Sequence, residues 1–173
     1  MILGITGSIG SGKTTIAKIF SKYHFNRIDA DEIAHKIIGN KEIKNNIVKI
    51  FGSKVLDKNK KVSRKVLGDV VFGNKSKLNK LNSIMLPSII NEIKAQIKKV
   101  QNKCGADAKI VIDAPLLLET KAKNFVYKVV VVKSTKRSII KRMNKRYSEE
   151  KIEKILKAQM PLDKKLEYVD FVI

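Results

Sequence analysis

The stretch GITGSIGSGKTTIAKIF, from Gly4 to Phe20, decides the fold of this chain. Within it, GSIGSGKT (Gly7–Thr14) matches the spacing G-x-x-x-x-G-K-[ST] at every fixed position. The apolar run before it, residues 2–6, predicts a buried parallel strand. Apolar residues at helical spacing from Ile16 to Tyr23 predict a helix after it. Because this motif requires a turn between a strand and a helix, we predict a loop that holds nucleotide phosphates.

The residue types in this loop indicate how it would hold a triphosphate. Its glycines lack the Cβ atoms that would stop the backbone from curling around a phosphate, so the backbone N–H groups point inward. Lys13 can reach the β- and γ-phosphates, the Thr14 hydroxyl can ligate Mg²⁺, and Thr15 is placed to help hold the α-phosphate. The dinucleotide spacing G-x-G-x-x-G is not matched. The predicted ATP-binding residues are Gly7, Gly10, Ser11, Gly12, Lys13, Thr14 and Thr15.

The order of the remaining patterns predicts one α/β domain with a parallel sheet. Strand-like runs occupy residues 25–31, 109–115, 126–133 and the end of the chain, and amphipathic helices lie between them. The helical stretch 32–108 is too long for one crossover, so we expect a helical insertion between core segments 1–31 and 109–173. Within it the pattern predicts separate helices around residues 78–85 and 89–100. A further helix opens at Ser148, whose side chain would cap it.

Composition limits the classes of function. The net charge of +21 allows a nucleic-acid partner, but lysine and asparagine are abundant along the whole chain, which explains the charge equally well. Tryptophan is absent and aromatics make up 6% of residues, which argues against base stacking, so we expect no nucleic-acid partner. No apolar run could cross a membrane, no signal peptide opens the chain, and Cys104 is the one cysteine. We expect a cytoplasmic protein, monomeric or oligomeric.

Several charged residues are candidates for chemistry beside the loop. Asp29 and Asp31 would share one face of an extended strand, as a base and a second acid, or would simply cap and begin a helix. Asp113 ends an apolar strand, where a carboxylate can reach Mg²⁺ or merely close a turn. Arg142 and Arg146 are spaced i, i+4, so they would share a helix face and could close over a γ-phosphate, or only solvate that face.

The γ-phosphate could go to water or to a second substrate. A GTPase would carry N-K-x-D and D-x-x-G sequences, and neither is present. The motif leaves two other classes open: a small-molecule or nucleoside monophosphate kinase, and a basic nucleic-acid-binding ATPase.

Several blocks, taken in order, resemble the dephospho-CoA kinase family along the whole chain. They are GITGSIGSGKTT, IDADEIAH, FGSKVL, SRKVLGDVVF, DAPLLLE, KVVVVK, KRMNKR and AQM. The resemblance implies a P-loop nucleotide-kinase fold with a five-stranded parallel sheet, a helical substrate insertion and a lid at about 137–150. It implies ATP-dependent phosphorylation of the ribose 3′-hydroxyl of dephospho-CoA, the last step of coenzyme A synthesis, with Mg²⁺.

The family's functional residues carry over to matching positions. Asp31 matches the general base and Asp29 its supporting neighbour. Arg64 matches a substrate-side arginine, and Gln159 a glutamine in the helix after the lid. Asp113 opens the family's D-x-P-L-L-x-E block, and Arg142 and Arg146 match the lid arginines.

The chain also departs from the family pattern. His35 stands where the family usually has arginine, and Leu86 where it usually has histidine. The family commonly continues past the last strand, and the adenine contacts therefore stay unassigned.

Overall fold

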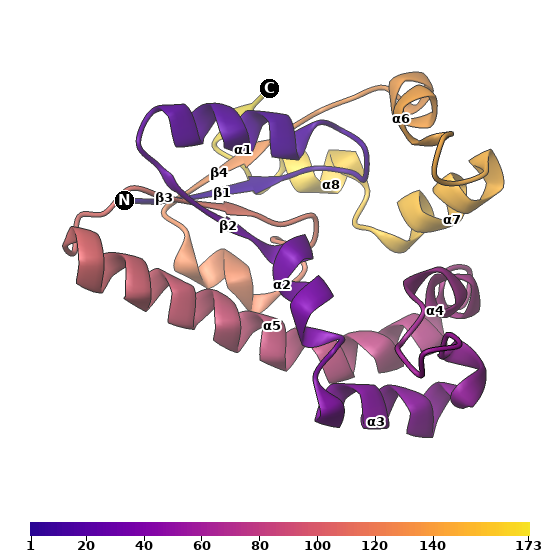
Figure 1. Cartoon of the computed structure of the whole chain (residues 1–173). Helices are drawn as coiled ribbons and strands as arrows, with labels where there is room; N and C mark the ends of the chain where they lie inside the picture. Colours follow the sequence, from indigo (N-terminus) through magenta and orange to yellow (C-terminus); the bar gives the residue numbers. More distant parts are fainter.

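Five parallel strands form the centre of the computed structural model, which describes residues 1–173 (Figure 1). Their order across the sheet is β2-β3-β1-β4-β5. The strands are β1 Ile2–Thr6, β2 Asn26–Asp29, β3 Ile110–Asp113, β4 Lys128–Val131 and β5 Phe171–Val172. The predicted parallel α/β fold is therefore confirmed. The second predicted strand is shorter than expected, because Asp29 ends it and caps the next helix.

The alternation of side chains along the strands divides the sheet into two faces. Helix α1 (Lys13–Lys22) covers one face, where Leu3, Ile5 and Val111 form a core with Ala17. The opposite face carries a larger core that includes Ile28, Ile110 and Ile112. Strands buried on both faces need apolar residues at almost every position. Charged side chains on these strands are therefore exceptions, and they occur near the strand ends.

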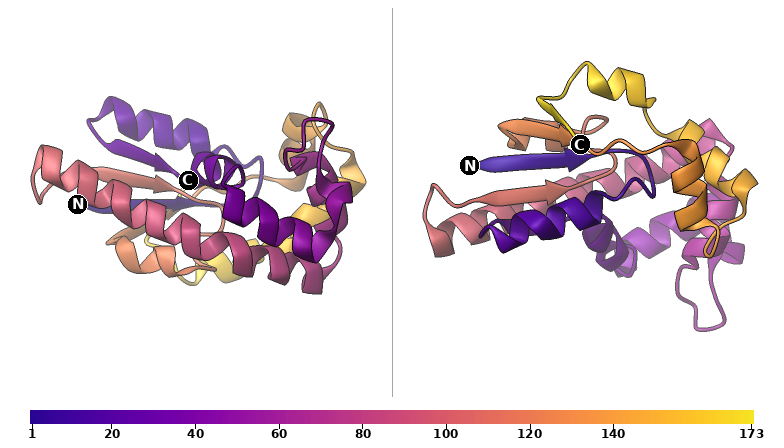
Figure 2. Two further views of the ribbon diagram at one scale, coloured as in Figure 1. Left: turned by 60° about the horizontal axis from the view of Figure 1, so that its bottom comes forward. Right: turned by 90° about the horizontal axis from the view of Figure 1, so that it is seen from above.

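The stretch predicted as an insertion forms four helices. They are α2 Ala30–Ile37, α3 Lys41–Phe51, α4 Arg64–Val71 and α5 Lys75–Cys104, with the short 3-10 turn η1 Ser53–Val55. The later part of α5 runs along one face of the sheet, whereas α2, α3, α4 and the first part of α5 lie at the carboxyl end of the strands (Figures 1 and 2). Their inner faces form a separate core that contains Ile47, Val71 and Met85.

Helix α5 replaces the two helices that the sequence pattern predicts, and this is a correction. It runs for 30 residues through Pro87. A proline inside a helix costs about 3 kcal/mol, because it lacks a backbone N–H and crowds the preceding turn. Met85 before the proline packs in the insertion core, and Ile93 after it packs under the sheet. Burial on both sides of Pro87 offsets that cost and keeps the helix continuous.

The 3-10 turn η2, Lys121–Phe125, lies between β3 and β4. Three helices lie between β4 and β5: α6 Lys136–Met143, α7 Glu149–Ala158 and α8 Leu162–Leu166. Ser148 caps α7 as predicted, because its side chain accepts a hydrogen bond from the Lys151 N–H. Figure 1 shows α6 and α7 beyond the carboxyl ends of the strands, at the same end as α3 and α4. No helix combines the length and the apolar character that crossing a membrane would demand.

Candidate active site

The glycine-rich loop lies where the sequence predicts, between β1 and α1. Gly7, Gly10 and Gly12 adopt φ angles of 146°, 69° and 105°, which favour glycine over other residues. A Cβ on Gly7 would lie 2.5 Å from the Val132 carbonyl oxygen, so this turn admits no side chain. The Ser11 hydroxyl oxygen is buried and has no hydrogen-bond partner within the protein. The loop thus offers donors and a narrow turn, as a phosphate cradle requires.

Lys13 opens helix α1 and is almost completely buried, with 7% of its surface exposed. Its Nζ donates a hydrogen bond to the Ser8 carbonyl oxygen at 2.8 Å, so the ammonium group folds back over the loop. Burial lowers the pKa of Lys13, while the carboxylates of Asp31 and Asp113 act in the opposite direction. A desolvated ammonium group over a glycine-rich loop interacts strongly with anions, because little water screens it.

Two residues from the segment after β4 hold the loop from outside. Arg142, on α6, donates from Nη1 to the carbonyl oxygens of Gly10 at 3.1 Å and Ser11 at 3.2 Å. Gln159, which follows α7 instead of lying within it as predicted, accepts a hydrogen bond from the Ile9 N–H at 3.0 Å. The loop is therefore attached to the segment that the family resemblance identifies as the lid and its following helix.

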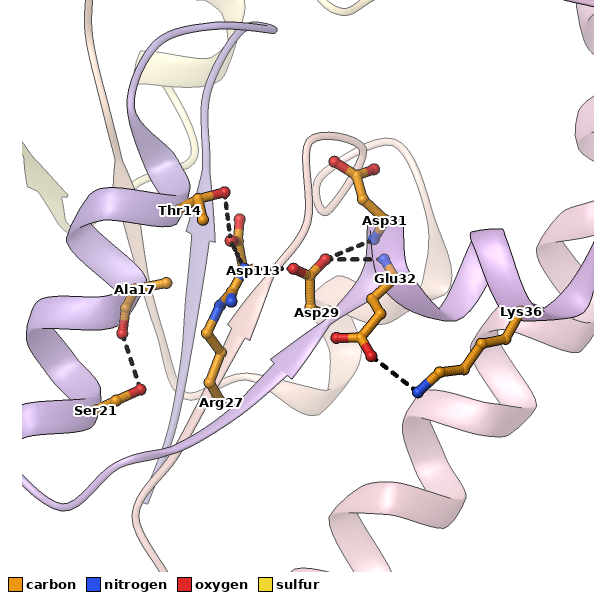
Figure 3. A network of polar contacts seen from close by, with 9 residues as sticks. All are labelled: Thr14, Ala17, Ser21, Arg27, Asp29, Asp31, Glu32, Lys36 and Asp113. Carbon is orange, nitrogen blue, oxygen red and sulfur yellow. Dashed lines mark hydrogen bonds and ion pairs between the residues drawn. The ribbon is translucent and has the colours of Figure 1, made fainter. Parts of the chain in front are cut away.

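Thr14 and Asp113 meet beside the loop. The Thr14 hydroxyl donates to Asp113 Oδ2 at 3.2 Å, and Asp113 is buried with 3% of its surface exposed (Figure 3). The register places Asp113 opposite Ile5 of β1 on one side and opposite Asp29 of β2 on the other. A hydroxyl and a carboxylate are ligands that Mg²⁺ prefers, and kinases complete its shell with substrate phosphates and water. The residues present therefore fit a magnesium ion bound together with a nucleotide.

The pair Asp29 and Asp31 does not share a strand face, which corrects the prediction. Asp29 is the N-cap of α2, and its Oδ1 accepts the N–H groups of Asp31 at 2.9 Å and Glu32 at 3.0 Å. Asp31 lies in the first turn of that helix. The alternative reading of Asp29 as a helix cap describes what the chain does. The side chain of Asp31 points away from the cap and is free of hydrogen bonds in Figure 3.

Asp31 lies close enough to Lys13 for each to shift the other's pKa. Desolvation by the surrounding protein raises the pKa of the Asp31 carboxyl, although the residue is exposed at the surface, and nearby Asp29 acts in the same direction. Lys13 and Arg64 oppose that change. A raised pKa makes a carboxylate a better proton acceptor near neutral pH. The helix cap and the loop thus bring an acid and a buried amine near each other, although β3 separates their strands.

Arg64, the first residue of α4, contacts helix α2. Its Nη1 lies 2.8 Å from His35 Nδ1. Arginine has no acceptor, so His35 must accept at Nδ1 and carry its proton on Nε2. The residue that departs from the family pattern thus orients the arginine that matches it.

Arg146 does not share a helix face with Arg142, which is a second correction. Helix α6 ends at Met143, and the Arg146 N–H closes a tighter turn onto the Met143 carbonyl oxygen, three residues earlier, ahead of the Ser148 cap. Arg146 instead lines a cavity of about 420 Å³ between α4 and the start of α7. The other residues of this cavity are Lys65, Asp69, Asn144, Lys145, Tyr147, Ser148 and Lys151.

Sequence reasoning missed two charged residues near the loop. Lys165, on α8, is fully buried, and its Nζ donates to the Pro115 carbonyl oxygen at 2.8 Å and pairs with Glu119 at 3.1 Å. Arg27, on β2, pairs with both Asp29 and Asp113. Arg27 carried a detectable signal, since residues two apart on a strand share a face. Lys165 did not, because it is one of many lysines in polar sequence.

This chain is a P-loop kinase. Its phosphate loop lies on a parallel sheet, Asp113 accepts a hydrogen bond from Thr14, and Asp31 lies near Lys13. The dephospho-CoA kinase family model matches residues 1–173. The chain belongs to the dephospho-CoA kinase family and is a phosphotransferase enzyme. Curated relatives of the chain carry the name of the enzyme for the final step of coenzyme A synthesis, and ATP use follows from the P-loop kinase fold.

Individual relatives agree with this assignment. The chain is 39% identical to the dephospho-CoA kinase of Fusobacterium nucleatum over 100% of its own length and 88% of that protein. The solved dephospho-CoA kinase from Campylobacter jejuni superposes with a TM-score of 0.66 and 31% identity, over 99% of this chain and 86% of that one. The structure of TT1252 from Thermus thermophilus has a TM-score of 0.78 at 22% identity, over 99% and 86%, and shows the fold alone.

Proposed function

We propose that this chain transfers the γ-phosphoryl group of ATP to the ribose 3′-hydroxyl of dephospho-CoA, with Asp31 as the base. The observation that carries the proposal is the position of Asp31, in the first turn of α2, near the buried Lys13 ammonium group that folds over the phosphate loop. Phosphoryl transfer depends on positioning and on stabilising charge, and the site supplies a cation on one side and a proton acceptor on the other.

The nucleotide side would be formed by the loop and its attachments. The backbone N–H groups of residues 7–12 and the Lys13 ammonium would bind the β- and γ-phosphates, with Thr15 at the α-phosphate. Thr14 and Asp113 would hold Mg²⁺, which neutralises phosphate charge when bound. Arg142 already contacts the loop, and Arg146 would reach the phosphates only if the turn after α6 moves inward. Such closure would exclude water, which competes as an acceptor.

The acceptor side would be formed by helices α2 and α4. The Asp31 carboxylate would take the proton of the 3′-hydroxyl at one of its oxygens, a role typically worth about 10²- to 10⁴-fold in rate. Arg64, oriented by His35, would bind an anionic part of the acceptor, because a guanidinium fork suits phosphate oxygens. In this scheme Asp29 acts indirectly, by capping the helix that carries Asp31, and Gln159 acts through the loop.

The test is a direct assay of acceptor choice. The purified chain is incubated with ATP, Mg²⁺ and one of three acceptors: dephospho-CoA, shikimate or a nucleoside monophosphate. Mass spectrometry should detect one added phosphate on dephospho-CoA and none on the others. Lys13→Ala should abolish transfer, and Asp31→Asn should slow it while ADP binding stays nearly unchanged. Phosphorylation of another acceptor, or normal turnover by the Asn variant, would contradict the proposal.

We also propose that the chain works in the cytoplasm as a monomer. Its cysteine, Cys104, is exposed and free, which suits a reducing compartment. Light scattering of the purified chain at micromolar concentration should give the mass of one copy, and the mass of two or more would overturn the monomer.

A further inference from the structure

Arg27 is a charged residue within the site that the reaction scheme above does not use. It lies on β2, and 21% of its side chain is exposed. Its Nη2 donates to Asp113 Oδ2 at 2.8 Å and also pairs with Asp29 Oδ2. Figure 3 shows its side chain rising from β2 toward Asp113, with Asp29 to one side and Thr14 to the other. One guanidinium group therefore joins the strand that ends in the helix cap to the strand that ends in the magnesium-side acid.

The sheet register explains why an arginine is needed at this position. Asp29 and Asp113 are direct partners on neighbouring strands. Like charges directly opposite each other destabilise a sheet. Arg27 pairs with Val111, so Asp113 is its diagonal neighbour, within reach of a long side chain. Both carboxylates bind one nitrogen, Nη2, which the planar guanidinium group holds in a fixed place, whereas a lysine ammonium group rotates on a flexible stem.

The hydrogen bonds also distinguish the two acids. Both oxygens of Asp29 are engaged, Oδ1 by the N–H groups of α2 and Oδ2 by Arg27. Asp113 receives Thr14 and Arg27 on the same oxygen, Oδ2, and no protein group donates to Oδ1. Asp29 therefore serves as a helix cap, whereas Asp113 keeps its Oδ1 free beside Thr14.

We propose that Arg27 is a positioning residue for the kinase reaction. It fixes the Asp113 carboxylate in the orientation that leaves Oδ1 free, and it fastens the cap of the helix that carries Asp31 to the same acid. This inference rests on the proposed function, in which Thr14 and Asp113 hold Mg²⁺. Arg27 acts through Asp113, so its removal weakens the magnesium-dependent part of nucleotide binding more than the part due to the loop alone.

The experiment measures ADP affinity by calorimetry, with Mg²⁺ and with a chelator. The ratio of the dissociation constant with chelator to that with Mg²⁺ isolates the contribution of the metal and requires no acceptor. Arg27→Met should leave the chelator value within about twofold and reduce the ratio by roughly tenfold or more, the loss typical of a group that orients a metal ligand. Arg27→Lys keeps the charge and should lose less. Lys103→Met removes an exposed charge at the end of α5 and should change neither value.

A double-mutant cycle tests the route through Asp113. Asp113→Asn alone should reduce the ratio, and adding Arg27→Met to it should reduce the ratio no further, because both changes remove one interaction. An unchanged or larger ratio in Arg27→Met overturns the proposal, as does full additivity of the two changes. An equal loss with and without Mg²⁺ also overturns it, since that result means general damage. Failure of the acceptor assay would refute the proposed function and leave this measurement readable, because ADP binding is scored independently.

Discussion

At the scale of single residues, the opposite pKa shifts of Asp31 and Lys13 predict a bell-shaped pH dependence. Desolvation by the surrounding protein raises the pKa of Asp31, and only the ionised carboxylate can accept a proton. Activity should therefore rise with pH through a value above the ordinary 3.8 of aspartate. Burial lowers the pKa of Lys13, so activity should fall at a pH below the ordinary 10.5 of lysine. The profile of kcat/KM against pH checks both limbs.

Lys13→Arg is the matched variant for the alkaline limb. Arginine stays charged throughout the accessible range, so the limb should disappear or move upward, whatever activity remains. An alkaline limb at the same pH in this variant would assign that limb to another group.

The raised pKa of Asp31 also predicts that replacing its carboxylate stabilises the folded chain at neutral pH. Because its pKa is higher in the folded chain, the folded state binds more protons than the unfolded state between pH 3.8 and that raised value. Stability therefore falls as pH rises through this window and stays lower above it. Asp31→Asn should raise the melting temperature at pH 7 and make no difference at pH 3, by a modest amount because the carboxyl is open to solvent. Thermal unfolding followed by circular dichroism at both pH values measures this.

At the scale of elements, the attachment of the phosphate loop to the end of α7 predicts a role for Gln159. Its Oε1 is the acceptor for the Ile9 N–H, which is part-buried. Gln159→Ala should weaken ADP binding several-fold, because a lost hydrogen bond costs about 1 kcal/mol, while the melting temperature changes little. Gln96→Ala, which removes an exposed hydrogen bond to Glu92 within α5, is the control. Equal ADP affinity in the two variants would show that Gln159 does not support nucleotide binding by the loop.

At the scale of the whole molecule, an ion pair joins the two groups of helices beyond the sheet. Lys151 of α7 pairs with Asp69 of α4, across the cavity that Arg146 lines. Asp69→Asn should speed hydrogen exchange in residues 144–151 of the ligand-free enzyme and cost at most about 1 kcal/mol of stability, since the aspartate is exposed. High salt should produce the same change in the unmodified chain.

The control for that prediction is Glu150→Gln, which breaks an ion pair with Lys154 inside α7. It should leave exchange in residues 144–148 unchanged. If Asp69→Asn behaves in the same way, the pair does not restrain the turn.

The sequence predicts those parts of the site that depend on short-range patterns. The loop from Gly7 to Thr14 and the cap at Ser148 follow from local spacing, and both lie where predicted. The bridge of Arg27 to Asp113 depends on strand order and register, which local spacing does not contain. The length of α5 depends on two separate cores on either side of Pro87. The positions of Asp31 and Arg146 were missed because a cap and a turn end their elements a few residues early.

The continuity of α5 has a consequence for how such an enzyme can move. Ile93 packs one part of this helix against the sheet, and Met85 packs another part into the core that it forms with α3 and α4. A hinge between the sheet and the helices α3 and α4 would have to break α5 or unpack one of the two cores. We therefore expect the acceptor site to be formed before the acceptor binds. Only α6 and the start of α7 should move when both substrates are bound.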